Sequence, residues 1–548
     1  VLFKQMLKML SLDFICNYDS LILKDTKKIN KLAFALDMAV AGRSDESVWI
    51  RQAQEIRKQM TDSLIDSAFT YLPEGVKHDE IELIKRKLKR RRLELEAVAC
   101  QYYRLLQRTP VVAGTNQSDY FLIERQAPDR TILRIYDPET GDCRLEQQFS
   151  GKETKELWLY GLAGNDTFEV KGNTRKDFPI YLISGEGENQ YQLNHSRKIH
   201  VYDKDYKYDY QKIKYHKISF TPWGIYDSDK GISLGTFFTY TMYGFKRAPF
   251  TYQHRIGYNY LKGFMYAGVF PNYDGRRRLY LNASISSPRN FENFFGFGNN
   301  TAGYKEEKKN YNRVKLRTYM LNPSFEMDLR KEEVVTFFGS LDMYKAKRTD
   351  DRYIYTVYGE DHPIFRTNYF VGLGATYRIT KQPYSWLPLL ETEWTAGWKM
   401  NLKKPERNFP YAQGSLSWNV RFSDRFTWAS LMKGTVLFDN DYEFYQAATI
   451  DLRGFRDNRF IGKQSFYQYS DLRLDMGKLK NPFTPLKYGL FAGFDYGRVW
   501  FPGERSHCWH TSYGGGIWLT FLNKFTTKYS WFGSTDSFRF AFELGLGF

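Results

Sequence analysis

The sequence is poor in cysteine and contains no long hydrophobic run. Its longest apolar stretch, residues 31–42, is shorter than a bilayer-spanning helix and contains Asp37, which argues against transmembrane helices. Only four cysteines are present, and they show neither C-x-x-C spacing nor a disulfide framework: Cys16, Cys100, Cys143 and Cys508. The sequence begins VLFKQMLKML, with Val in place of an initiator Met and without the organisation of a signal peptide, as expected of a mature or truncated product.

Common catalytic motifs are also missing. The chain contains no G-x-S-x-G, P-loop or H-E-x-x-H sequence, and histidines such as His195, His200 and His216 have no nucleophile or carboxylate pattern beside them. His507, Cys508 and His510 in the sequence HCWH are soft metal ligands, but no fourth ligand is identifiable, so we interpret them as a chance cluster. We therefore predict a protein that is not an enzyme and holds no metal or cofactor.

The net charge is +18, yet the basic residues are not confined to one patch. This distribution weakens a nucleic-acid interpretation relative to anionic lipid or a basic exterior, and no nucleic-acid partner is predicted. The densest basic run, KRKLKRRR at 85–92, has two interpretations. It is either a site for phosphate or anionic lipid headgroups or, as we favour, a solvated helix face.

Aromatic residues, by contrast, are abundant: they make up 18% of the chain, with 42 Tyr and 43 Phe. From residue 217 onward, apolar and polar residues alternate with the period of a β-strand, as in RRLYLNASIS at 277–286. We count about sixteen such runs of roughly 10–14 residues, the length of a tilted bilayer crossing. Because lipid allows no open sheet edge, residues 217–548 are predicted to close into an antiparallel transmembrane β-barrel with aromatic girdles at both interfaces.

The region before the barrel is predicted to contain two parts. Residues 1–117 form a helical N-terminal region, with one helix from Glu46 that is broken by Pro-Glu-Gly at 73–75 and a second that reaches about residue 107. Residues 118–216 form a β-rich module of short strands. The predicted fold is therefore mainly β, with a mixed helical and short-strand region before the barrel.

Two segments of this module form one repeat, YGLAGNDTFEV at 160–170 and ISGEGENQYQL at 183–193. In their alignment Asp166 matches Asn189, and an aromatic and then an apolar residue follow at alternate positions. The pattern predicts a tight glycine turn and a strand with alternate residues inward. Calcium-binding β-solenoids use a similar nonapeptide, so Ca²⁺ at Asp166 is an alternative, but with two copies and no GGxGxD run we favour a stack without metal.

Four motifs follow one another in the last hundred residues: LRGF (452–455), QYSDLRL (468–474), GLFAGFDYGRVW (489–500) and SYGGGIWL (512–519). In this order they resemble the BamA-type superfamily, also called the bacterial surface antigen family, and the resemblance covers most of 217–548. NFFGFGN at 293–299 is similar to a sequence common in its Bacteroidetes members. The resemblance implies a barrel of the Gram-negative outer membrane. Its implied partners are outer-membrane lipid or lipopolysaccharide, client outer-membrane or secreted proteins, and periplasmic or lipoprotein subunits.

The upstream sequence has a narrower resemblance, carried by three segments: 88–106, 152–172 and VYDKD at 201–205. They resemble the region before the barrel in Bacteroidetes proteins that fuse a metallophosphoesterase to such a barrel, which implies a periplasmic N-terminal region. The phosphoesterase motifs D-x-H, G-D-x-x-D and G-N-H-E have no counterpart here, and the repeated POTRA domains of the archetype are not evident.

The resemblance also implies roles for individual residues. In the family the arginine of R-G-F points into the barrel, so Arg453, followed by Gly454 and Phe455, is expected to pair with Asp495, with Asp471 nearby. A glycine at 454 allows a conformation that a side chain would block. The last strand, with Gly545, Gly547 and Phe548, is expected to form a weak seam with the first strand.

Three functions are compatible with these features. The leading hypothesis is assembly of outer-membrane proteins or translocation of a substrate across the outer membrane, by addition of a client strand at the seam. The second is a membrane anchor or product channel for an envelope-modifying phosphoesterase system. The third is a passive pore.

Overall fold

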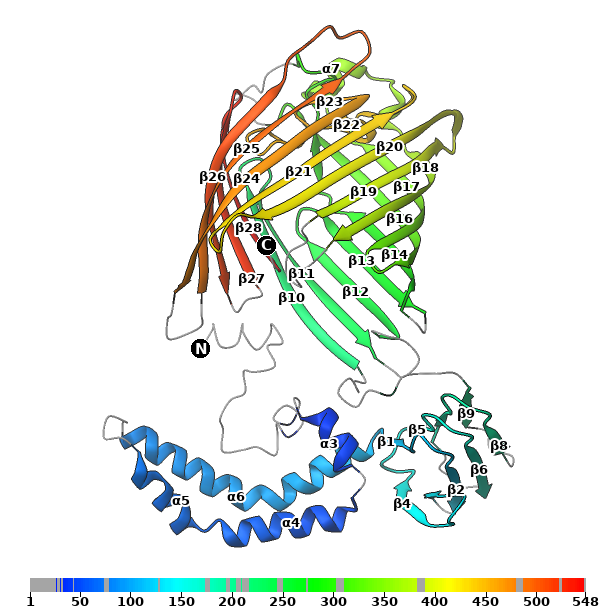
Figure 1. Ribbon diagram of the computed structural model, residues 1–548. Coiled ribbons are helices and arrows are strands. Elements are labelled where there is room, and N and C mark those ends of the chain that lie inside the picture. Colours follow the sequence, from blue (N-terminus) through cyan, green and yellow to red (C-terminus); the bar gives the residue numbers. More distant parts are fainter. Residues whose placement is uncertain are drawn as a thin grey trace. The chain divides into compact units, whose positions relative to one another are not determined.

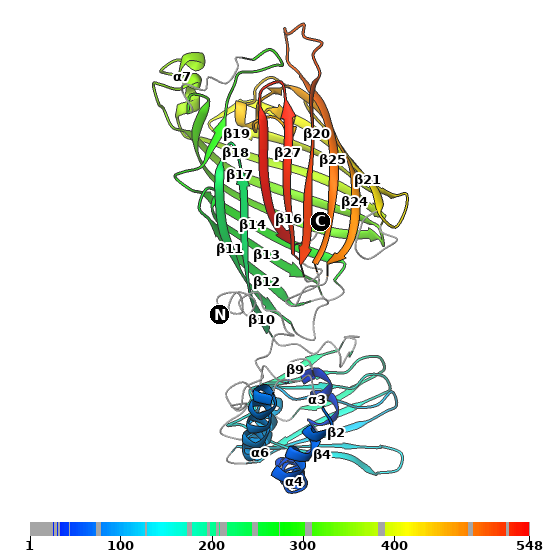
Figure 2. The same ribbon diagram turned by 90° about the vertical axis from the view of Figure 1, so that its left-hand side faces the viewer.

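The computed structural model describes residues 26, 30 and 33–546 except 43, 73–77, 127–128, 173–177, 194–197, 204–207, 209–215, 244–249, 273–274, 302–309, 382–389, 480–485 and 522–524. The chain divides into two compact units: residues 1–215 with 243–247, and residues 216–242 with 248–548. The first unit contains a helical part and a module of short strands, and the second is a β-barrel (Figures 1 and 2).

Helices α4 (Glu46–Gln59) and α6 (His78–Gln107) lie side by side in the first unit, after the short α3 (Phe34–Val40) (Figure 1). The prediction of one unbroken helix from Glu46 to Pro-Glu-Gly is wrong at residues 60 and 61. Thr61 has an extended backbone and its hydroxyl accepts a hydrogen bond from the Leu64 amide at 3.1 Å, so a new helix, α5 (Asp62–Ala68), begins there. It continues into the 3₁₀-helix η2 (Phe69–Tyr71), and residues 73–75 lie outside the described residues.

Among the described residues, no helix combines the length and the apolar character needed to cross a membrane. The basic run at 85–92 lies in α6, where four of its side chains form ion pairs with acids of α5 or α6: Lys85–Glu82 (2.9 Å), Lys89–Asp66 (2.7 Å), Arg90–Glu94 (3.4 Å) and Arg92–Asp62 (3.0 Å). Two of these pairs join α5 to α6, so part of the run connects the helices.

The β-module is a stack of short parallel strands in two sheets. One sheet has the order β1 (Val111–Ala113), β5 (Leu157–Tyr160), β7 (Ile180–Ile183), β9 (Ile199–Tyr202). The other has the order β4 (Cys143–Ser150), β3 (Arg130–Tyr136), β2 (Tyr120–Gln126), β6 (Thr167–Gly172), β8 (Gln190–Leu193). In the second sheet β2, β6 and β8 are parallel, and β3 and β4 add as an antiparallel hairpin.

The repeat has a third copy that the sequence analysis missed. Phe168 pairs with Tyr191 in the predicted alignment, and it also pairs with Phe121 of β2 on its other side. The three rings are stacked, with centroid distances of 4.5 Å for Phe121–Phe168 and 5.7 Å for Phe168–Tyr191. The first copy was hidden because Gln117 occupies the position two residues before the aspartate where the other copies have Gly164 and Gly187.

An aspartate and asparagine ladder connects the three turns. Asp166 Oδ1 accepts a hydrogen bond from the Asp119 amide, and Asn189 Oδ1 accepts one from the Asp166 amide, both at 2.9 Å. Asp119 in turn binds Arg144 at 2.8 Å. Burial raises the pKa of Asp166 to about 7, so this carboxyl is largely neutral below that pH. The side chains at the proposed Ca²⁺ position therefore bind backbone amides of the neighbouring turn.

Within the described ranges, no group of three or more His, Cys, Asp or Glu side chains is placed to hold a metal ion. His510, one member of the HCWH sequence, stacks on Phe460 with a centroid distance of 3.5 Å. Cys508 is exposed. The three side chains of this sequence are thus not gathered around one point.

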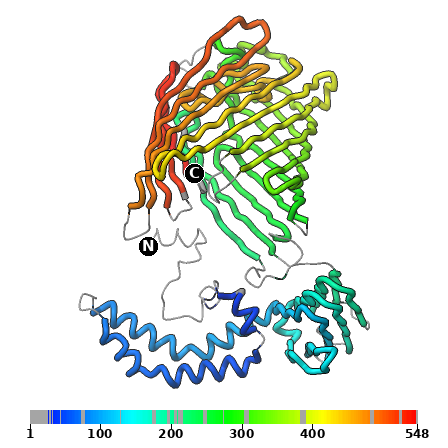
Figure 3. The backbone as a smooth tube through the Cα atoms, viewed as in Figure 1, coloured from blue at the N-terminus to red at the C-terminus, as the bar shows by residue number. Residues whose placement is uncertain are grey.

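The second unit is a closed antiparallel barrel of 16 spanning strands, which confirms the predicted fold class (Figure 3). In chain order the spanning strands are β10 (His216–Asp227), β11 (Gly231–Met242), β12 (Tyr252–Asn259), β13 (Gly263–Pro271), β14 (Arg277–Ser286), β16 (Arg313–Arg330), β17 (Glu333–Ala346), β18 (Asn368–Lys381), β19 (Leu390–Asn401), β20 (Lys404–Arg421), β21 (Phe426–Leu437), β24 (Gln464–Leu479), β25 (Leu486–Trp500), β26 (His510–Phe521), β27 (Phe525–Ser534) and β28 (Phe538–Leu546). The short β15 (Phe291–Asn293) pairs with residues 313–315 of β16. Outside the strands, α7 (Tyr353–Tyr358) and the 3₁₀-helix η5 (Pro363–Phe365) lie between β17 and β18.

The alternation along the strands separates an apolar exterior from a polar interior. In β14, Leu279 and Ile285 are 48% and 47% exposed on the outer surface. On either side of Leu279, Arg278 and Tyr280 point inward and bind Glu326 of β16 at 2.7 and 2.9 Å. Large exposed apolar side chains occur on most of the other strands too, as expected of a surface that faces lipid.

Candidate functional site: the luminal loop and the closing seam

The loop between β21 and β24, residues 438–463, lies at the centre of the site, and we call it the luminal loop. Among the described connections between spanning strands after β19, it is the longest. It contains the 3₁₀-helix η6 (Phe444–Gln446) and the two short paired strands β22 (Ala448–Thr449) and β23 (Ile461–Gly462). Its side chains Leu452, Phe455 and Phe460 are buried and form one cluster with Tyr467 and Val499 of the barrel wall. Apolar burial therefore fixes the loop against the inside of strands β24 and β25.

Arg453 lies at the centre of this loop and contacts two carboxylates of the wall. Its Nε is 3.1 and 3.0 Å from the two carboxylate oxygens of Asp495, to which Nη2 also donates, and its Nη1 donates to Asp471 at 2.7 Å. The Arg453 amide and the Ser512 hydroxyl donate to the same Asp495 oxygen at 3.2 and 2.9 Å. Asp495 is fully buried, so the pair is shielded from water. The forked contact of the guanidinium with the carboxylate makes the pair directional. The structure thus brings together the three charged residues that the resemblance implied.

Gly454 and Phe455 follow in the same turn. The φ of Gly454 is not positive, so it is not the backbone dihedral that excludes a side chain at this position. The reason for glycine is space: a Cβ at this position would lie 2.7 Å from the Ser512 Cβ and 2.9 Å from the Gly533 carbonyl oxygen. Phe455 is 3% exposed. The R-G-F sequence therefore combines an ion pair, a close backbone approach and an apolar anchor.

Four more charged residues of the loop, at positions 451, 456, 457 and 459, also have partners. Arg456 binds Asp229, Asp457 binds Lys230 at 2.7 Å, and Arg459 binds Asp536. The Tyr469 hydroxyl donates to Asp451 at 3.3 Å. Sequence reasoning missed the partners Asp229, Lys230 and Asp536 because they lie in tight turns with no motif, and the first two precede the loop by more than two hundred residues.

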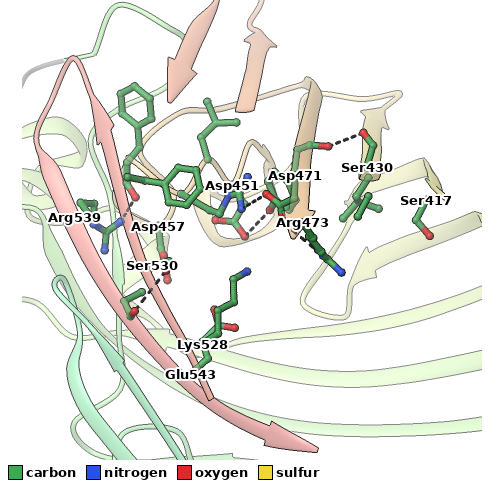
Figure 4. Close-up of a pocket in the computed structure, with 18 of the residues that line it drawn as sticks. Ser417, Ser430, Asp451, Asp457, Asp471, Arg473, Lys528, Ser530, Arg539 and Glu543 are labelled. Atoms are coloured by element: carbon green, nitrogen blue, oxygen red, sulfur yellow. Dashed lines mark hydrogen bonds and ion pairs between the residues drawn. The ribbon is translucent and has the colours of Figure 1, made fainter. Parts of the chain in front are cut away.

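A cavity of about 510 Å³ lies between the luminal loop and strands β20, β21, β24, β27 and β28 (Figure 4). Its lining includes four acidic and four basic side chains: Asp451, Asp457, Asp471, Glu543, Arg453, Arg473, Lys528 and Arg539. Serines 417, 430 and 530 add hydroxyl groups. Because the charges are balanced, the cavity suits polar groups without selecting ions of one sign.

The barrel closes through a short pairing of its first and last strands, which we call the seam. In the described part of the two strands, four residue pairs join β10 to β28, from Gly224–Leu544 to Asp227–Ala541. By comparison, β10 forms twelve pairs with β11, and β28 forms nine with β27. Gly545 pairs with Thr526 of β27, whereas Gly547 and Phe548 lie outside the described residues. Among the described residues, the seam has the fewest pairs of all the spanning strand contacts.

These features define a class: a transmembrane-type β-barrel whose interior holds one of its own loops and whose closing seam is short. No family model and no curated protein matches the chain. Solved structures similar to it include BamA from Haemophilus ducreyi lacking POTRA domains 1–3, with a TM-score of 0.44 and 11% identity over 61% of this chain and 70% of that chain. CdiB from Acinetobacter baumannii has a TM-score of 0.37 and 11% identity over 62% of this chain and 66% of that chain. CdiB from Escherichia coli has a TM-score of 0.38 and 9% identity over 65% of this chain and 66% of that chain. At these identities the likeness concerns the fold.

Proposed function

We propose that the chain is an outer-membrane barrel of the BamA-type superfamily that inserts outer-membrane proteins or passes a substrate across the outer membrane, with its first unit in the periplasm. The proposed clients are proteins with extended segments, and outer-membrane lipid or lipopolysaccharide surrounds the barrel. Periplasmic or lipoprotein subunits are further proposed partners. The chain itself is assigned no catalytic step.

The short seam is the observation that carries this proposal. Each backbone pair in a sheet contributes hydrogen bonds, so a contact of four pairs is the easiest place for the barrel to open. Beyond it, residues 216–223 of β10 have no recorded pairing with the described part of β28. An unpaired strand edge accepts an extended segment of another chain by β-augmentation. A client strand is therefore proposed to add along β10.

A disulfide across the seam tests the proposal. Ile225 and Glu543 are directly paired, and Cα atoms of opposite residues in antiparallel strands are about 4.5–5.5 Å apart, within the range of a disulfide. The matched control replaces Thr376 and Thr395, which pair across β18 and β19 with their hydroxyls 2.8 Å apart. Both pairs are made in a background in which the four native cysteines are replaced by serine.

The expected result is that cells depending on the Ile225→Cys/Glu543→Cys variant lose outer-membrane assembly until a reductant is added, while the control pair has no effect. Normal assembly with a fully formed seam disulfide would contradict the proposal. Depletion of the protein, followed by separate profiling of outer-membrane proteins and lipids, distinguishes the alternatives. A lipid or phosphate phenotype with normal protein assembly would instead indicate an envelope-modifying system.

A further inference from the structure

The luminal loop contacts residues on both sides of the seam. The turn at 228–230 joins β10 to β11, so it belongs to the side of the first strand. The turn at 535–537 joins β27 to β28, so it belongs to the side of the last strand. The first turn follows the last seam pair, Asp227–Ala541, directly, and residues 538–540 separate the second turn from the same pair. Contacts of the loop with both turns therefore act at the paired end of the seam.

On the side of the first strand, two ion pairs connect the loop to the turn. Arg456 Nη1 binds Asp229 Oδ1, and Asp457 Oδ2 binds Lys230 Nζ at 2.7 Å. The Asp229 side chain is fully buried and also accepts a hydrogen bond from Asn293. Lys230 and Asp457 remain 27% and 41% exposed. One pair is thus fixed in the interior, and the other is open enough to be changed without creating a buried lone charge.

On the side of the last strand, the contacts involve both charge and backbone. Arg459 binds Asp536, and the Ser534 hydroxyl donates to the Gly454 carbonyl oxygen at 2.7 Å. Arg539 of β28 donates to the Phe455 carbonyl oxygen of the loop and, through Nε, to the Ser228 hydroxyl at 3.1 Å. Arg539 therefore connects the last strand, the loop and the turn after the first strand.

We propose that the luminal loop holds the seam closed, so that docking of the loop and closure of the barrel are one coupled event. Arg453 anchors the loop to Asp471 and Asp495 on the wall, which gives the seam contacts a fixed point from which to act. With the loop in place, the first and last strands are joined by its side chains as well as by their four backbone pairs. With the loop displaced, the backbone pairs and the few direct side-chain contacts across the seam, such as Arg539 with Ser228, remain. The use of such opening by a client rests on the proposed function, whereas the coupling itself does not.

The coupling is measured on the purified full chain in lipid nanodiscs, without any client. Spin labels at Ile232 of β11 and Phe538 of β28 lie on opposite sides of the seam, and both side chains are on the exterior, 62% and 70% exposed. Pulsed electron paramagnetic resonance gives the distribution of distances between the labels. The variants are Lys230→Gln, Asp457→Asn and the double variant, and the control is Arg330→Gln, which removes an exposed ion pair at the turn between β16 and β17.

Each single variant is expected to broaden the distribution and add a population at longer distance, while the control keeps the wild-type distribution. The double variant is expected to match the singles, because the second change removes the same contact. Unchanged distributions in the single variants, or additive shifts in the double variant, would overturn the proposal. Heat-dependent migration in gels shows whether each barrel is folded. If the distances shift but the seam disulfide leaves assembly normal, the proposed function fails and the coupling stands. If the distances stay unchanged but the seam disulfide blocks assembly, the coupling fails and the proposed function stands.

Discussion

Gly493 of β25 leaves the space that the guanidinium of Arg453 occupies: a Cβ at Gly493 would lie 2.6 Å from Arg453 Nη2 and 2.7 Å from Asp471 Oδ1. Gly493→Ala is therefore expected to displace the guanidinium and to lower the stability of the folded barrel by about 1–3 kcal/mol, the usual cost of overpacking. The temperature at which the barrel loses its compact migration in gels measures the change.

Gly434→Ala is the matched control for this substitution. Gly434 also lies in a barrel strand, but the nearest atom to an added Cβ is 3.5 Å away, which is ordinary contact. The control is expected to keep the wild-type transition temperature within error. Equal transition temperatures for both variants and the wild type would show that the wall yields and that the ion pair does not depend on Gly493.

Arg453→Ala is expected to open the interior of the barrel to ions. The substitution leaves the fully buried Asp495 without its main partner, at a cost of about 3–5 kcal/mol, and removes the ring contact of 3.9 Å with Phe532. The loop then loses its anchor, and single-channel conductance in planar bilayers should rise and fluctuate. Arg453→Lys should not restore the wild type, because an ammonium cannot make the two-pronged contact. A large, steady conductance that is the same in wild type and Arg453→Ala would favour the passive-pore hypothesis.

The strands were predictable because one physical signal, a period of two, runs through each of them. The predicted run at 277–286 coincides with β14, since its apolar residues face outward and its polar residues inward over the whole length. The ion pairs of the loop are different in kind. Nothing near Asp229 in the sequence indicates Arg456 as its partner, because only closure of the barrel brings the two together.

The first unit shows the same division. Phe168 and Tyr191 could be aligned because both copies keep glycine at the turn, whereas the copy with Phe121 has Gln117 there and escaped detection. A spacing rule finds it: in each copy the Asx residue lies six residues after the end of the preceding strand, as with Ala113 and Asp119. The helix break at Thr61 was missed because a capping threonine is also acceptable within a helix.

The ladder in the β-module should make the first unit sensitive to pH through Asp166. The pKa of this carboxyl is raised by burial from 3.8 to about 7, so between these values the unfolded chain releases a proton that the folded chain keeps. The contribution of Asp166 to the stability of the module is therefore greatest below pH 3.8 and is expected to fall as the pH rises through this window. Above pH 7 the loss amounts to about 4 kcal/mol.

Asp166→Asn tests this expectation, since an amide resembles the neutral carboxyl and keeps an oxygen for the Asp119 amide. Pulse proteolysis in urea between pH 5 and 8, read on fragments of the first unit of the full chain, measures stability. The wild type should lose stability across this range, while the variant stays nearly constant and exceeds the wild type at pH 8. Parallel curves for the two proteins would assign the pH dependence to other groups.

The stacking of the turns should make Gly187 far less tolerant of a side chain than a glycine with similar freedom elsewhere. Gly187 has a φ of 122°, and a Cβ there would lie 1.9 Å from the Gly164 carbonyl oxygen of the turn below. Gly141 also has a positive φ, 76°, but no atom lies within 4 Å of its added Cβ. Both alanine variants carry the cost of a positive φ, about 1–2 kcal/mol near the left-handed helical region where Gly141 lies and more at Gly187, and only Gly187→Ala adds a clash. By pulse proteolysis, Gly187→Ala should unfold the module at clearly lower urea than Gly141→Ala, because the rigid backbone of the neighbouring turn cannot move away without breaking the ladder between Asp166 and Asn189. Equal losses in the two variants would mean that the turns are not held in contact by the ladder.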